Sequence, residues 1–147
     1  MLFRTFVFVA LAATVAASQT PRQQCRVTTY SERINRGEVT EFQKWINEGH
    51  EPWRIDEADA VASVYLIDFA KKHNELPSPV THPHKELKHS ERLAAYEFES
   101  VSESVTFRVA LTKFSWLLPT ARKWDHMAWF VTEVRVIEHP KACQEAK

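Results

Sequence analysis

The chain has 147 residues, of which 44% are hydrophobic, and its 19 Lys and Arg balance its 19 Asp and Glu. This neutrality argues against a nucleic-acid binder, which usually shows a basic excess, and the presence of only two glycines, Gly37 and Gly49, excludes the standard loops that cradle phosphates. A single domain of this length buries roughly two thirds of its unfolded surface, so we expect it to fold without a metal or a cofactor.

The first seventeen residues, MLFRTFVFVALAATVAA, have the parts of a secretory signal peptide: an early cation at Arg4, an apolar run, and small residues before a cleavage site. We expect cleavage near Ser18, which leaves one domain over residues 18–147. The apolar run is too short to serve as a membrane anchor. The sequence therefore predicts an exported protein, secreted or periplasmic, without a membrane anchor.

Two cysteines, Cys25 and Cys143, lie near the two ends of the exported part. An exported protein meets oxidising conditions, so we expect these cysteines to form a disulfide bond. Two free thiols or an intermolecular bridge are the alternatives. Closing so long a loop stabilises a fold by roughly 4 to 5 kcal/mol in the chain-entropy model.

Two helices are predicted in the first half of the domain. The first runs from about Glu38 to Glu48, and Gly49 supplies its C-terminal stop. The second runs from Asp56 to His73, with Asp56 as N-cap and three cationic residues at its end. The apolar face of the first helix consists of Val39, Phe42, Trp45 and Ile46. The core face of the second consists of Ala58, Val61, Ala62, Tyr65, Leu66 and Phe69.

The second helix also carries a minor apolar stripe away from its main face, formed by Ala60, Val64 and Ile67. We interpret this stripe as the surface that receives the first helix. A contact between two copies of the chain in a homodimer is the alternative.

Residues 74–92, NELPSPVTHPHKELKHSER, show almost no periodicity and predict a long loop, the kind of segment that often carries function.

The rest of the sequence predicts an antiparallel sheet. The clearest strand covers residues 105–114, where apolar and polar side chains alternate. Residues 93–100 alternate as well, and we expect a hairpin in which Glu97 or Glu99 pairs with Arg108. The inward residues of the clearest strand are Val105, Phe107, Val109 and Leu111, and those of the earlier strand are Tyr96 and Phe98.

A last strand is predicted from about His126 to Glu138, because this segment is rich in β-branched and aromatic residues. Its first half is apolar on both faces, which predicts burial on both sides or a bulge. One face is expected to hold Phe130, Thr132, Val134 and Val136. The other is expected to hold Trp129, Val131, Glu133 and Arg135.

Three histidines in the long loop, His82, His84 and His89, are the candidate metal ligands. Imidazole suits zinc and copper, and an H-x-H pair can offer two nitrogens to one ion. Solvated loop histidines are the alternative reading, since no H-E-x-x-H helix is present.

For acid-base chemistry the candidates cluster around the turn between the helices: His50, Glu51, Asp56 and Asp59, with His126 further along. The alternative is structural: acidic residues are also favoured at the N-terminus of a helix, where they cap it.

The tryptophans divide into core and loop positions. Trp45 on a helix face and Trp129 in a strand are assigned to the core. The remaining three lie in loops with basic residues, a combination that suits recognition surfaces, although loop tryptophans also cap sheets. The resulting candidate ligand-binding residues are Trp53, Arg54, Trp116 and Trp124.

The order of helix, helix, long loop and three or more antiparallel strands predicts an α+β fold with two N-terminal helices packed on a curved sheet. This order resembles that of cystatin-like rolls and of nuclear-transport-factor-like rolls, whose sheets wrap a helix. We expect an exported binding module for a protein or a small apolar ligand, because the inward strand positions are mostly apolar. A small cavity enzyme that uses His50, Asp56 or His126, or a metal-handling protein, is the alternative.

Overall fold

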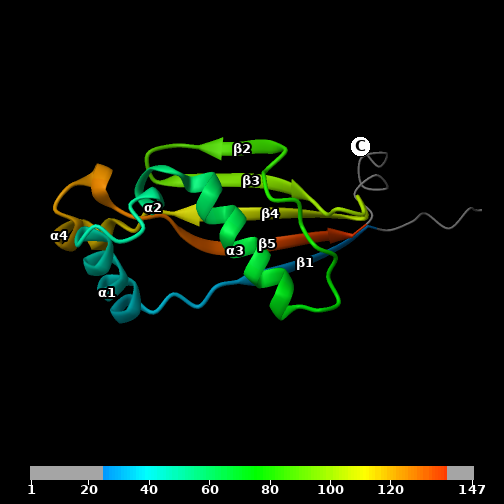
Figure 1. Ribbon diagram of the computed structural model, residues 1–147, viewed down its shortest axis with the longest axis horizontal. Helices are drawn as coiled ribbons and strands as arrows, with labels where there is room; N and C mark the ends of the chain where they lie inside the picture. Colours follow the sequence, from blue (N-terminus) through cyan, green and yellow to red (C-terminus); the bar gives the residue numbers. More distant parts are fainter. Residues whose placement is uncertain (1–24, 139–147) are drawn as a thin grey trace, which may run out of the picture.

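The computed structural model describes residues 25–138, which form an α+β domain with an open, antiparallel five-stranded sheet and four helices (Figure 1). The strands follow the order β1-β5-β4-β3-β2, so the first strand pairs with the last and the other four form a meander. They are β1 (Arg26–Ser31), β2 (Lys85–His89), β3 (Leu93–Glu99), β4 (Val105–Thr112) and β5 (Phe130–Glu138). The predicted α+β class is confirmed. The predicted signal peptide and Cys143 lie outside the described residues.

One long helix crosses a face of the sheet, and the other helices gather at one end of the molecule (Figure 1). The long helix is α3 (Ala58–Lys72), and the others are α1 (Arg36–Asn47), α2 (Trp53–Asp56) and α4 (Leu118–Ala121). Short 3-10 turns at Ser115–Leu117 and Trp124–His126 flank α4. The core lies between α3 and the sheet, where the inward side chains of β4 cluster with Val61, Leu66 and Phe69; Tyr65, which was also expected to contact them, is only partly buried at the edge of this cluster.

The two predicted helices exist with shifted ends. The side chain of Asn35 accepts hydrogen bonds from the backbone N–H groups of Gly37 (3.0 Å) and Glu38 (3.4 Å), so α1 begins two residues earlier than predicted. Gly49, at a φ of +94°, ends it as expected. The N-cap assignment of Asp56 is wrong, because Asp56 is the last residue of the separate turn α2 and α3 begins at Ala58.

The buried face of α1 differs from the predicted one. Gln43 is fully buried beside Val39 and Ile46, whereas Trp45 remains 37% exposed and stacks on His50 with ring centroids 4.7 Å apart. The assignment of Trp45 to the core is therefore wrong. The reason is that α1 packs against α4 and the segment before β5, whose backbone groups require a polar partner.

The first helix was expected to pack on the minor apolar stripe of α3. Instead, α1 packs chiefly against α4. Val64, in the centre of the stripe, is 43% exposed. Exposed apolar residues that occur singly are normal on protein surfaces. The homodimer contact through this stripe stays a prediction.

Both edge strands of the sheet lie in segments without a strand pattern. The predicted long loop contains β2, and the N-terminal lead-in contains β1. All five residues of β2 are exposed, so no apolar side chains alternate in it. The loop prediction for residues 74–92 is thus wrong over residues 85–89, where an edge strand pairs with β3.

The predicted bulge in the last strand is confirmed. Ala110 is opposite Glu133 while Leu111 is opposite Val131, so Thr132 is the extra residue of β5, and its hydroxyl donates to the Ala110 carbonyl (3.2 Å). Because of this extra residue, the side chains that precede Thr132 point to the opposite face from the one that strict alternation would give them. Val131 therefore joins Val134 and Val136 in the main core. Phe130 instead packs against a second apolar cluster, formed by Val39, Leu117, Ala121 and Met127. The predicted grouping of Phe130 with Val134 is therefore wrong, and the strand starts at Phe130 rather than His126.

The predicted cross-strand ion pair of Glu97 is present and has a second partner. Arg108 Nε lies 2.6 Å from one carboxylate oxygen of Glu97, and His84 Nε2 lies 3.0 Å from the other. Burial raises the pKa of Glu97, but the hydrogen bonds and charges of Arg108 and His84 together outweigh burial and leave this pKa below its ordinary value.

Because the pKa of Glu97 is lowered by folding, its stabilising effect is complete above the ordinary carboxyl pKa of 4.5 and is lost as the pH falls through the folded value. We expect Glu97→Gln to lower the free energy of unfolding by about 1 kcal/mol at pH 6. The difference should shrink as the pH falls below 4.5. Urea unfolding of both proteins from pH 6 to pH 3 measures this. A difference that stays constant over this range would contradict the assignment.

Candidate functional site

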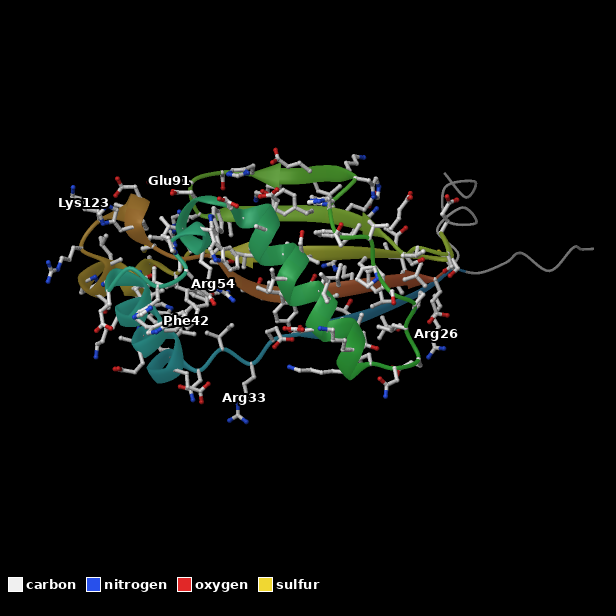
Figure 2. The ribbon with its side chains drawn as sticks, viewed as in Figure 1. Arg26, Arg33, Phe42, Arg54, Glu91 and Lys123 are labelled. Atoms are coloured by element: carbon white, nitrogen blue, oxygen red, sulfur yellow. The ribbon has the colours of Figure 1, made fainter. Side chains whose placement is uncertain are left out.

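A cavity of about 800 Å³ opens at the end of the sheet where α2 and α4 lie; we call it the end cavity. Its walls come from α2, from the turn between β2 and β3, and from the segment between β4 and β5. Glu91 and Lys123, from two of these walls, lie at the same end of the molecule in Figure 2. Three basic and three acidic residues line the cavity: Lys113, Arg122, Lys123, Asp56, Glu91 and Asp125.

Lys113 is the most unusual of these residues, because it is only 7% exposed. Its Nζ lies 4.8 Å from the centre of the Trp129 ring, a cation–π contact. Desolvation by burial lowers the pKa of Lys113, although the charges of Asp56, Asp125 and Glu91 act in the opposite direction. Among residues 25–138, no carboxylate lies within 4.0 Å of this ammonium.

Two indole rings, together with Ile55 and Leu118, supply the apolar part of the cavity wall. Trp129 is buried, as predicted for a core residue, and its backbone N–H donates to the Arg54 carbonyl (2.9 Å) of α2. Trp124 is 37% exposed, and the guanidinium of Arg92 lies 5.2 Å from the centre of its ring. The cavity therefore combines a fixed aromatic surface with a more accessible one.

The rim of the cavity contains a strained residue. Arg122 follows α4 directly and has a φ of 69°, in the left-handed region. This conformation costs an L-residue other than glycine, Asn or Asp roughly 1 to 2 kcal/mol. Its N–H donates to the Leu118 carbonyl (2.8 Å) and closes α4, so the strain is built into the rim. Strained backbone of this kind concentrates at functional sites.

The four predicted ligand-binding residues are not brought together. Only Trp124 lines the end cavity, while Trp53 packs against the main core. The guanidinium of Arg54 lies 5.0 Å from the centre of the Phe42 ring, and these two residues neighbour each other in Figure 2. Trp116 stacks on Phe114 with centroids 5.2 Å apart, within the second apolar cluster. These three residues thus have packing partners within the fold.

The predicted metal ligands are separated as well. Within the part of the chain that the structure describes, no three His, Cys, Asp or Glu side chains are placed to hold one ion. His84 pairs with Glu97, and His89 Nδ1 lies 3.1 Å from Glu86 Oε2, while His82 has no contact with either. The structure therefore does not support a metal site formed by His82, His84 and His89.

The candidate acid-base residues do not converge on one point. Asp56 lines the end cavity, whereas His50 stacks on Trp45 at the far side of α1. His126 is exposed in the turn before β5 and is 4.0 Å from Asp125. An acid-base pair built from His50, Asp56 and His126 is thus not formed by this arrangement.

A second cavity, of about 550 Å³, lies between β1 and α3. Some of its polar groups have partners: Asp68 pairs with Lys71 at 3.2 Å, and His73 lies 3.5 Å from Glu75. Burial, followed by the interaction with Glu32, raises the pKa of Tyr65. The lysine that lines this cavity, Lys72, is exposed, whereas Lys113 is nearly buried and has no carboxylate within 4.0 Å among residues 25–138, so the end cavity is the stronger candidate for a ligand site.

Lys113 was not among the residues that the sequence singled out, although a signal was present. It follows Val105, Phe107, Val109 and Leu111 at the same spacing of two. A lysine that continues an inward-facing apolar row points toward the core side of its sheet. Such a lysine is rarely buried without a reason, because the buried charge is expensive.

No protein-family model, curated protein or solved structure matches the chain. Among the described helices, none has both the length and the apolar composition needed to cross a membrane.

Proposed function

We propose that the protein is a binding module that holds a small ligand in the end cavity. An apolar or aromatic part of the ligand packs against Trp124 and Trp129, and an oxygen acceptor such as a carboxylate or a carbonyl meets the ammonium of Lys113. The observation that supports this is a lysine that is only 7% exposed, lines a cavity of about 800 Å³ and, among residues 25–138, has no carboxylate within 4.0 Å of its ammonium. A bound oxygen acceptor would offset the cost of burying that charge.

The charges of the wall restrict the ligand further. Asp56, Glu91 and Asp125 line the same cavity, so a ligand with several negative charges would be repelled. A ligand with one carboxylate, or with a neutral carbonyl, fits this balance better. Of the two partners expected from the sequence, a protein and a small apolar ligand, the cavity favours the small ligand.

The binding experiment uses 2-naphthoate and its neutral analogue 2-naphthamide as probes, with the domain of residues 18–147 and isothermal titration calorimetry. We expect 2-naphthoate to bind more tightly than 2-naphthamide, and Lys113→Met to weaken 2-naphthoate binding at least about tenfold, the effect of losing one charge-assisted hydrogen bond. Lys88→Met, an exposed lysine of β2 outside the cavity, is the matched control and should leave the affinity unchanged. Equal weakening by both substitutions would show that Lys113 does not contact the probe.

We further propose that the protein is exported and that its sheet is curved as in the cystatin-like and nuclear-transport-factor-like rolls. The signal-peptide pattern of residues 1–17 supports export. The bulge at Thr132 supports curvature, since a bulge bends its strand. Mass spectrometry of protein recovered from a secreting host should find an N-terminus at or near Ser18.

A further inference from the structure

The environment of the Lys113 amine differs from that of the ion-paired lysines Lys44 and Lys71. Lys44 lies 2.6 Å from Glu41 and Lys71 lies 3.2 Å from Asp68, both on exposed helix surfaces. The ammonium of Lys113 instead lies 4.8 Å from the centre of the Trp129 ring, and Lys113 lines the end cavity. An ion-paired lysine is held protonated, whereas an amine in apolar surroundings loses its proton more readily.

We propose that Lys113 Nζ is a nucleophile that captures the carbonyl carbon of an aldehyde or ketone ligand as an imine. This inference rests on the proposed ligand site and names the class of ligand. A desolvated lysine in an apolar pocket is the usual form of an amine that attacks carbonyl compounds. Trp129 provides the apolar surface under the amine, and the cavity provides room for the carbonyl compound beside it.

The reaction is balanced without an oxidant or a reductant. The neutral amine of Lys113 forms a C–N bond with the carbonyl carbon; the nitrogen then loses one proton and the former carbonyl oxygen takes up one, which gives a neutral carbinolamine. The nitrogen then loses its remaining proton and the carbon loses its hydroxyl group, which leaves as water with a proton from a cavity acid. One imine and one water result from one amine and one carbonyl group.

The walls of the cavity carry groups that can exchange those protons. The charged and titratable side chains that line it around Lys113 are Asp56, His89, Glu91, Arg122, Lys123 and Asp125. The three carboxylates counteract the loss of the proton from Lys113, and burial outweighs them, since the pKa of Lys113 is lowered. The amine is therefore more often neutral than an exposed lysine at the same pH.

The test uses 2-naphthaldehyde as the probe and sodium cyanoborohydride to reduce any imine to a stable secondary amine. The domain of residues 18–147 is treated at neutral pH, and peptide mapping by mass spectrometry gives the rate of modification at each lysine. We expect Lys113 to be modified at least about tenfold faster than exposed Lys88, because a lowered pKa enlarges its neutral fraction. The rate at Lys113 should also level off at a lower pH than the rate at Lys88.

Lys113→Arg is the matched variant, because it keeps a cation over Trp129 but cannot form an imine under these conditions. In this variant we expect no lysine to be modified faster than the exposed Lys88. Modification spread evenly over Lys113 and the exposed lysines would overturn the inference. If 2-naphthoate binds but Lys113 is not trapped, this inference fails and the proposed function stands. If neither probe engages the cavity, both fail.

Discussion

Replacing both cysteines by serine, Cys25→Ser with Cys143→Ser, is expected to lower the free energy of unfolding by roughly 4 to 5 kcal/mol. The structural reason lies in the pairing of the first strand with the last. Arg26 is opposite Glu138 in the antiparallel β1–β5 pair, and Cys25 immediately precedes Arg26. Cys143 follows Glu138 by a short segment, so a bond between the two cysteines would close a loop that contains the whole sheet.

Chemical denaturation of the oxidised protein, the reduced protein and the double-serine variant provides the measurement. The reduced protein and the variant should unfold at the same denaturant concentration, well below that of the oxidised protein. Thiol titration of the denatured, oxidised protein gives the control and should detect no reactive thiol. Two titratable thiols in that sample, or three identical unfolding curves, would show that no such bond stabilises the fold.

The parts of the fold that the sequence predicts are those in which burial imposes a period. In β4, every second residue from Val105 to Leu111 is buried, and α3 places its apolar residues on the face that packs against them. Burial on one side makes apolar and polar side chains alternate along a strand, and it gathers the apolar side chains of a helix on one face. The α+β class and the main core follow from these two elements.

The edge strand β2 has no such period. A strand at the edge of a sheet needs only backbone hydrogen bonds on one side, and charged side chains protect its free edge from pairing with other chains. The sequence KELKH of β2 is of this kind, and all its residues are exposed. Composition alone therefore makes it look like a loop, and only pairing with β3 reveals the strand.

The candidate site depends on features that lie outside periodic patterns. Of the candidate residues from the sequence, Trp124 and Asp56 line the end cavity; the sequence presents Asp56 both as a helix cap and as an acid-base candidate. Sequence reasoning read Lys113 as part of a strand and not as a buried charge, because the burial of that residue depends on α2 and on Trp129, far away in the sequence. The site is assembled by tertiary contacts among three separate segments. The periodicity of a single segment gives no information about such contacts.

The burial of Gln43 likewise depends on tertiary contacts, with α4 and with the segment before β5, and not on a local period. Gln43 is fully buried, its Oε1 accepts from the backbone N–H of Ala128 (2.9 Å), and its Nε2 donates to the carbonyl of His126 (3.0 Å). Gln43→Leu keeps a similar volume but leaves both backbone groups without this partner. We expect the free energy of unfolding to fall by roughly 2 to 4 kcal/mol, since each buried polar group left unsatisfied costs about 1 to 3 kcal/mol.

Urea unfolding measures this loss, and Lys44→Leu on the exposed side of the same helix is the control. That substitution removes only a surface ion pair and should change stability by less than about 0.5 kcal/mol. Hydrogen exchange adds a local readout: the amide of Ala128 should exchange slowly in the natural protein and faster in Gln43→Leu. A Gln43→Leu protein with unchanged stability and a protected Ala128 amide would contradict this role.

The effect should extend to the end cavity, because the segment that Gln43 fixes leads directly into Trp129. Trp129 in turn donates its backbone N–H to Arg54, so α1, α2 and the start of β5 are joined through consecutive backbone contacts. Loss of the anchor frees the chain between Trp124 and Trp129, both of which line the cavity. We therefore expect Gln43→Leu to weaken 2-naphthoate binding although Gln43 does not line the cavity, whereas Lys44→Leu should leave binding unchanged.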